Sequence, residues 1–241
     1  MTRRALLWCG WADPARVLDF PASVKDLDLA VRAARALGVR DMDMHAFLSH
    51  ADLISGPEVS QYAATIDALE RVVASLAREA TADDALLFIA TNHGEQLGLL
   101  TSGPVDEFSS DEDMPRHLSP AILRQCLDKI PGTQVLIFAT CHAGVFLPLA
   151  HENRAVLASC AADQVYLVQE DPPCSPFLIE FFKAWCSIEL PGYQTVFSEG
   201  VLELDAAFLQ AEQRLSQGDY PAEYKKLRPL RQGTARWPQP R

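Results

Sequence analysis

The sequence predicts an α/β fold in which a central, mostly parallel β-sheet carries helices on both faces. Three observations lead to this prediction. Short apolar runs recur along the chain, stretches with helical periodicity separate them, and apolar residues make up 49% of the 241 positions. Strands that are apolar throughout are typical of parallel sheets buried on both faces, and the helices between them form the crossovers.

Five apolar runs are expected to form the strands. The clearest are 84–94, with the sequence DALLFIATNHG, and 133–141, with the sequence TQVLIFATC. Both are short continuous apolar runs, as expected of strands in the middle of a parallel sheet. The same reasoning gives 4–10, 39–48 and 153–161, of which 39–48 alternates and is expected near an edge.

Five stretches show the periodicity of amphipathic helices. The first begins at Ser23, a residue that favours the amino-terminal cap, and ends at Gly38, which favours the residue after a helix. Its apolar residues recur at the spacing that places them on one face. The stretches are 23–38, 60–80, 119–132, 175–185 and 202–217.

Repeats and shifts of composition are not visible, so residues 1–226 are expected to form a single domain. The tail, 227–241, is basic and contains prolines, and we expect it to be flexible. An acidic, polar loop at 101–117 follows an expected β-hairpin, EQLGLLTSG. A long loop at this place could shield the site or be cut on activation, and the alternative is a solvated loop without a role.

Composition and charge exclude several classes of function. The net charge of −11 argues against non-specific binding to nucleic acid or to an anionic membrane, since both require clustered basic residues. A run approaching the roughly 18 apolar residues of a membrane span is absent, and the first residues do not resemble a signal peptide. We therefore expect a cytoplasmic protein.

The six cysteines include no CxxC pair, which makes a zinc ribbon or a thioredoxin motif improbable. In a reducing compartment most cysteines should be buried thiols. Neither a metal nor another cofactor is expected.

Two reactive side chains directly follow the two clearest strands. His93 stands in NHG at the end of the first, and Cys141 stands in CHAG at the end of the second. Ligands of open parallel sheets bind beyond the carboxyl ends of the strands, so adjacent strands would bring both side chains to one edge. An imidazole promotes the thiolate that acts as a nucleophile. The N–H groups of Gly94 and Cys141 could stabilise an oxyanion.

Each feature alone has a structural explanation, because a cysteine at the end of a buried strand usually belongs to the core. A His-Gly pair is also common. The coincidence of both at the ends of two buried strands favours the functional interpretation. His142 is the alternative base, although the residue next to a nucleophile on a turning chain usually points elsewhere.

Residues 84–166 resemble the caspase-like superfamily of cysteine peptidases, which includes caspases, metacaspases and legumain-type peptidases. The matching pieces are DALLFIATNHGEQLGLL, QVLIFATCHAG and RAVLASCAADQVY. The separation of histidine and cysteine is close to the roughly 50 residues found in caspases. The resemblance implies the caspase-like fold and a Cys–His dyad that cleaves peptide bonds. His93 would be the acid and base, and Cys141 the nucleophile.

The chain departs from the superfamily around the substrate pocket. Ala139 replaces the polar residue two positions before the nucleophile, and Asn92 stands where legumains have an acidic residue. In the superfamily the P1 pocket is lined by residues after the first strand and after the strand that follows the cysteine. These regions hold Asp13, Asp163 and Gln164, and a desolvated carboxylate would favour Arg or Lys at P1. The alternative for both aspartates is an exposed loop or a helix cap.

The expected function is thus that of a caspase-like cysteine endopeptidase with a protein substrate, activated by a further protease or an effector. Analogy with the superfamily suggests a bacterial defence or regulated-death pathway. Two alternatives stay open. One is a catalytically inactive, caspase-like interaction module, and the other is a thiol-dependent amidase that acts on a small molecule.

Overall fold

A seven-stranded sheet forms the centre of the computed structural model, in the order β12-β9-β8-β4-β1-β2-β3. The structure describes residues 1–11, 19–50, 53–54, 59–102, 117–166, 168–170, 173–186, 203–218 and 220–238. All neighbouring strands run parallel except β12, which pairs antiparallel with β9. The strands are β1 (Arg3–Cys9), β2 (Met44–Leu48), β3 (Ser60–Ala63), β4 (Ala85–Asn92), β8 (Thr133–Thr140), β9 (Arg154–Ala158) and β12 (Leu230–Gln232).

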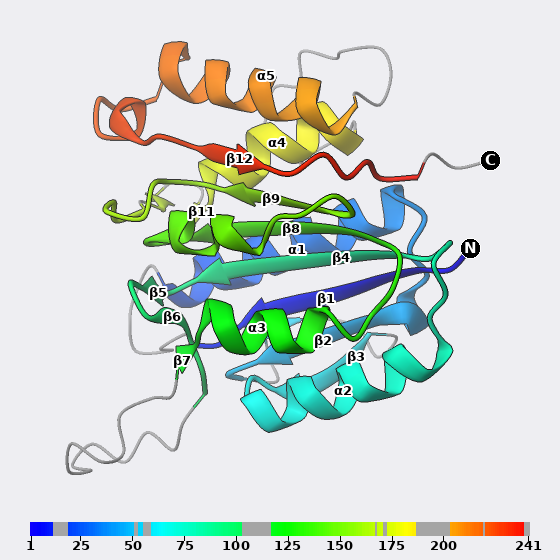
Figure 1. Cartoon of the computed structure of the whole chain (residues 1–241). Helices are drawn as coiled ribbons and strands as arrows, with labels where there is room; N and C mark the ends of the chain where they lie inside the picture. The colour runs from blue at the N-terminus through cyan, green and yellow to red at the C-terminus, as the bar shows by residue number, and fades with distance from the viewer. Residues whose placement is uncertain are drawn as a thin grey trace, which may run out of the picture.

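Helices cover both faces of the sheet (Figure 1). On one face α2 and α3 pack together, and on the other α1 packs against β4 and α4 while α5 packs on α4. This arrangement confirms the predicted α/β class. The helices are α1 (Asp19–Ala36), α2 (Ile66–Glu79), α3 (Pro120–Leu127), α4 (Pro176–Cys186) and α5 (Leu204–Gln217), with short 3₁₀ turns η1 (Asp41–Asp43), η4 (Ala143–Leu149) and η5 (Tyr224–Lys226).

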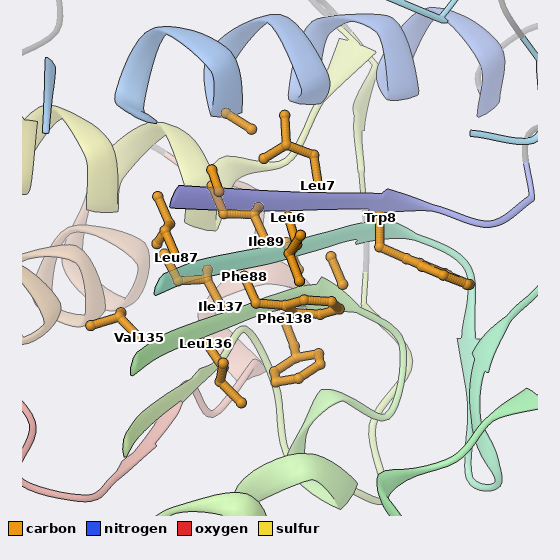
Figure 2. Packing of buried hydrophobic residues seen from close by; sticks show 14 of the residues in the cluster. Leu6, Leu7, Trp8, Leu87, Phe88, Ile89, Val135, Leu136, Ile137 and Phe138 are labelled. Carbon is orange, nitrogen blue, oxygen red and sulfur yellow. The ribbon is translucent and has the colours of Figure 1, made fainter. Parts of the chain in front are cut away.

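The core is built from side chains in register across the three central strands. Leu6, Phe88 and Leu136 form one row across β1, β4 and β8. The next residue of each strand lies on the opposite face, so both faces are apolar (Figure 2). These side chains are almost fully buried, which explains why the strands read as continuous apolar runs.

Two small sheets lie at the carboxyl ends of the central strands (Figure 1). The first contains the predicted hairpin, β5 (Gly94–Glu95) and β6 (Gly98–Leu100), together with β7 (His117–Leu118). The second pairs β10 (Gln169–Glu170) with β11 (Pro173–Cys174). They flank the edge at which His93 and Cys141 are expected.

The helix predicted over 60–80 is wrong in its first turn. Residues 60–63 form the edge strand β3, and the helix begins only after Thr65, whose hydroxyl accepts a hydrogen bond from the N–H of Ala68. An alternating edge strand and an amphipathic helix both place apolar residues two to four positions apart, so periodicity alone did not separate them.

The tail also differs from the flexible segment that its composition predicts. Its strand β12 completes one side of the sheet, and Trp237 is buried against Trp185 with ring centroids 6.1 Å apart. The indole N–H of Trp237 donates to the carbonyl of Leu37, and the Arg3 guanidinium donates to the carbonyl of Pro238. A buried aromatic anchor therefore orders the chain as far as residue 238.

None of the helices in the described part of the chain is both long and apolar enough to cross a bilayer.

Candidate active site

His93 and Cys141 follow neighbouring strands at the same level of the sheet. β4 and β8 pair in parallel, and their last register pair joins Asn92 to Thr140. Each candidate residue comes directly after its member of this pair. The chain leaves both strands with a residue in the left-handed region, Asn92 with φ of 77° and His142 with φ of 55°. The sheet thus brings the two candidates to one edge, as the sequence predicts.

Gly94 is in close contact with the segment that carries Cys141. A Cβ atom at this glycine would lie 2.6 Å from the carbonyl oxygen of Cys141 and 2.9 Å from the hydroxyl of Thr140. Real side chains do not tolerate such distances, so only glycine fits here. The turn after His93 therefore packs directly on the turn that holds the thiol.

The thiol of Cys141 is half-buried, whereas the other five cysteines are buried. Its sulfur lies 3.3 Å from the backbone nitrogen of Tyr166, which donates to it, and 3.5 Å from the Tyr166 carbonyl oxygen. Burial raises the pKa of Cys141, and the hydrogen bond from Tyr166 lowers it by a smaller amount. The thiol is consequently protonated at neutral pH in the resting protein.

Asn92 fixes the backbone that leads into His93. Its side-chain amide donates to the hydroxyl of Ser23 at 2.8 Å and to the carbonyl oxygen of Trp11. The indole ring of Trp11 lies against the imidazole of His93, with ring centroids 4.9 Å apart and planes inclined at 51°. The segment after β1 and the first turns of α1 therefore form the support behind His93.

His142 is held by the loop that follows β9. Its ring nitrogen Nδ1 lies 2.8 Å from the carbonyl oxygen of Ala162, and its backbone N–H donates to the carbonyl of Gln164 at 2.8 Å. These contacts occupy the ring nitrogen Nδ1 and direct the ring toward residue 162.

The three residues expected to line the P1 pocket differ from one another in their surroundings. The exposed carboxylate of Asp163 forms an ion pair with Arg228, with 2.9 Å between oxygen and nitrogen. The side-chain oxygen of Gln164 accepts from the N–H groups of Ala161 and Arg228, and its amide donates to the carbonyl of Lys226. Asp13 lies outside the described residues. The role of these three side chains in substrate binding stays a prediction.

The oxyanion role of the Gly94 and Cys141 N–H groups likewise stays a prediction. Of the acidic loop 101–117, residues 103–116 lie outside the described part. Its end is tied to the hairpin, because His117 Nε2 lies 3.0 Å from Glu95 Oε2.

All six cysteines lie in the described part, and none forms a disulfide. Five of them are buried, as expected of most of the cysteines: Cys9, Cys126, Cys160, Cys174 and Cys186. Within the described ranges, His, Cys, Asp and Glu side chains do not form a group of three or more that could hold a metal ion.

Sequence reasoning missed the groups that support the two candidates. Tyr166 contacts the thiol through its backbone, which no side-chain pattern reports. Asn92 carried a usable signal, because asparagine between a buried strand and His-Gly is one of the few residues that enter the left-handed region readily.

Comparison with known proteins gives one kind of match. The chain matches no protein-family model and no curated protein. Among solved structures it is similar to the crystal structure of caspase-1 from Spodoptera frugiperda, with a TM-score of 0.61 and 12% identity. The match covers 98% of this chain and 90% of that chain. The order of the strands, the helix layers and this similarity together show that the chain has a caspase-like fold.

Proposed function

We propose that the chain is a cysteine endopeptidase in which Cys141 is the nucleophile and His93 the acid and base. One observation carries the proposal. Asn92 and Thr140 are register partners on adjacent parallel strands, so His93 and Cys141 leave the sheet side by side at its carboxyl edge. The contact between Gly94 and the Cys141 carbonyl supports the same placement.

The chemistry begins with a neutral thiol, because burial raises the pKa of Cys141. His93 accepts the thiol proton as the sulfur bonds to the substrate carbonyl carbon. The imidazolium then protonates the leaving amine, the C–N bond breaks, and an acyl-enzyme forms. His93 next takes a proton from water, the hydroxide attacks the thioester, and the sulfur leaves with the proton returned to it.

Backbone groups would stabilise the charged species of this reaction. The N–H groups of Gly94 and Cys141 are proposed to face the oxyanion. The N–H of Tyr166, which donates to the Cys141 sulfur at 3.3 Å, would favour the thiolate.

We propose that the carboxylate of Asp163 binds a basic P1 residue of the substrate. Its carboxylate is exposed and already pairs with Arg228, so a substrate cation would have to replace that guanidinium. Asp163→Asn should lower cleavage after Arg and Lys relative to other residues, and Arg228→Gln should raise it. Because the pair is exposed, both variants should change stability by less than about 1 kcal/mol. A peptide library cleaved by the three proteins measures the preference, and an unchanged profile would reject Asp163 as a P1 ligand.

One observation favours the alternative of a catalytically inactive interaction module. The desolvated environment raises the pKa of the Cys141 thiol, which opposes formation of the nucleophile. Reactivity of this thiol therefore separates the two candidates.

The test is alkylation of Cys141 with iodoacetamide and with an acyloxymethyl ketone peptide, read by mass spectrometry, beside cleavage of a peptide library. An active peptidase is labelled at Cys141 by the peptide probe, and Cys141→Ala abolishes both labelling and cleavage. His93→Ala should abolish cleavage, and His142→Asn, which keeps a residue type that tolerates the left-handed backbone, serves as the control that retains it. Peptide cleavage by Cys141→Ala would contradict the proposal.

A further inference from the structure

A buried carboxyl that the proposed chemistry does not use contacts the strand that leads to His93. Asp26 on α1 is only 2% exposed. Its Oδ2 accepts a hydrogen bond from the hydroxyl of Thr91 at 2.5 Å, and its Oδ1 accepts one from the backbone N–H of Ser175 at 2.7 Å. Ionisable groups are rarely buried at this depth without a function or a network that requires them.

The first hydrogen bond leads to His93. Thr91 is the penultimate residue of β4 and directly precedes Asn92, which leads into His93. Ser23 lies one turn before Asp26 on α1 and accepts from the Asn92 amide at 2.8 Å. Helix α1 therefore holds the end of β4 at two successive residues, just before the chain turns.

The second hydrogen bond leads to Cys141. The hydroxyl of Ser175 lies 2.5 Å from the hydroxyl of Tyr166, which also accepts from the N–H of Phe177 at 2.9 Å. These contacts fix the buried ring of Tyr166, whose own backbone N–H and carbonyl contact the Cys141 sulfur. Tyr166, which contacts the thiol, is thus linked through Ser175 to the same carboxyl that binds the end of β4.

We infer that Asp26 is a positioning residue for the reaction proposed above, because its carboxyl joins the segment that ends in His93 to the segment that supports Cys141. This inference rests on the proposed function. Asp26 touches neither substrate nor the reacting atoms and acts only through Thr91 and Ser175.

The chemistry of the two hydrogen bonds predicts which substitutions of Asp26 preserve its contacts with Thr91 and Ser175. In Asp26→Asn the amide oxygen can still accept from Ser175 N–H, and the amide N–H can donate to the Thr91 hydroxyl. In Asp26→Ala both partners lose their acceptor in a dry environment and become free to move. The asparagine variant is therefore the conservative rescue of the alanine variant.

Asp84 offers a matched control at the opposite end of the sheet. It is also buried, and it accepts hydrogen bonds from the backbone of Thr81 at 3.0 Å and from Arg4 at 3.1 Å. Asp84→Asn should destabilise the protein without changing the edge that holds Cys141.

The experiment compares the wild type with these three variants at a temperature at which all are folded. It measures kcat and KM for the best peptide of the library and the rate of Cys141 alkylation by iodoacetamide. Asp26→Ala should lower kcat about tenfold or more with little change in KM, because small displacements of reacting groups have large effects on rate. Its alkylation rate should also change, whereas Asp26→Asn and Asp84→Asn should stay within about threefold of the wild type.

The inference would be overturned if Asp26→Ala folds and keeps the kcat and the alkylation rate of the wild type. It would also be overturned if Asp84→Asn loses as much kcat as Asp26→Ala. If Asp26→Ala does not fold, Tyr166→Phe tests the inference instead, because it removes only the hydroxyl that links Tyr166 to Ser175. An unchanged kcat and alkylation rate in that variant would overturn the inference, and a loss would support it. If the wild type cleaves no peptide, the peptidase proposal fails, and the role of Asp26 in peptide cleavage fails with it. A changed alkylation rate in Asp26→Ala alone would then still support the structural part of the inference, that this carboxyl holds the segment that supports Cys141.

Discussion

The backbone N–H of Tyr166 donates to the sulfur of Cys141, with 3.3 Å between nitrogen and sulfur. This contact favours the thiolate, but burial acts in the opposite direction and is the larger effect, so the pKa of Cys141 is raised. Loss of the thiol proton must therefore accompany substrate binding in the proposed reaction. In that reaction His93 accepts the proton, and the carbonyl carbon of the bound substrate is the electrophile.

Asn92 should be required for activity more than for folding. Asn92→Ala should destabilise the protein by about 1–3 kcal/mol, because alanine is strained at a φ of 77° and the bonds to Ser23 and Trp11 are lost. It should also lower kcat about tenfold or more, since the support of His93 is lost. Denaturant unfolding and peptide cleavage measure the two effects.

The control for Asn92 is Asn92→Gly, which accepts the left-handed backbone but lacks the amide. It should recover part of the stability and none of the activity. Full activity in the glycine variant would show that the amide does not position His93.

Gly94 should not tolerate a side chain. In Gly94→Ala the new Cβ would lie 2.6 Å from the Cys141 carbonyl oxygen, so the two turns must separate. We expect a loss of about 1–3 kcal/mol in stability and a loss of cleavage of about 100-fold. Gly132→Ala is the control, because its Cβ would collide with the Asp84 carbonyl at the other end of the sheet. It should reduce stability to a similar extent and leave kcat unchanged, and equal losses of kcat would contradict the assignment.

The stability of the protein should depend on pH through Asp26. Burial raises its pKa from 3.8 to about 7, and the hydrogen bonds from Thr91 and Ser175 offset only part of this effect. The ionisable groups that interact with it are Cys9 and Tyr166, and burial raises the pKa of both, so both are uncharged near neutral pH. The folded state thus disfavours the ionised carboxyl.

An acid whose pKa is raised on folding contributes full stability below its unfolded pKa and loses that contribution as the pH rises to its folded pKa. Between pH 4 and pH 7 the free energy of unfolding of the wild type should therefore fall relative to that of Asp26→Asn. The size should be on the order of 4 kcal/mol. Denaturant unfolding at pH 4, 5.5, 7 and 8 measures it, and parallel curves for the two proteins would show that Asp26 does not titrate in this range.

Trp237 should stabilise the whole domain. Its ring is buried against Trp185 and its indole N–H donates to Leu37. Trp237→Ala should cost about 3–5 kcal/mol, as for other large buried aromatics. Trp237→Phe keeps most of the packing and should cost about 1 kcal/mol, mainly for the hydrogen bond. A loss below 1 kcal/mol for the alanine variant would mean that the tail is only loosely attached.

Strands β4 and β8 could be predicted from sequence because burial on both faces leaves only apolar residues between the turns. The general geometry of parallel sheets predicts that the residues after two such strands lie at one edge, and β4 and β8 are paired in this way. In contrast, β3 and β12 are short edge strands with mixed composition, and their periodicity resembles a helix or a loop. Tertiary pairing, not local preference, makes them strands.

The supports of the site could not be predicted for a different reason. Ser175 and Asp26 are 149 positions apart and meet only after the whole sheet has formed. The thiol is held by the backbone of Tyr166, and every residue type except proline provides the same N–H. Such contacts leave no spacing in the sequence that a pattern could detect.

The attachment of Pro238 to Arg3 has a consequence for fusion proteins. Arg3 begins β1 at the amino end of the sheet, whereas Cys141 follows the last residue of the parallel strand β8. Eight residues of extended strand span about 26 Å, so Pro238 lies near the end of the sheet opposite to the one that carries the thiol. A fluorescent reporter or an affinity handle placed there would leave the edge that carries Cys141 open, while a tethered peptide would need a linker long enough to reach from one end of the sheet to the other.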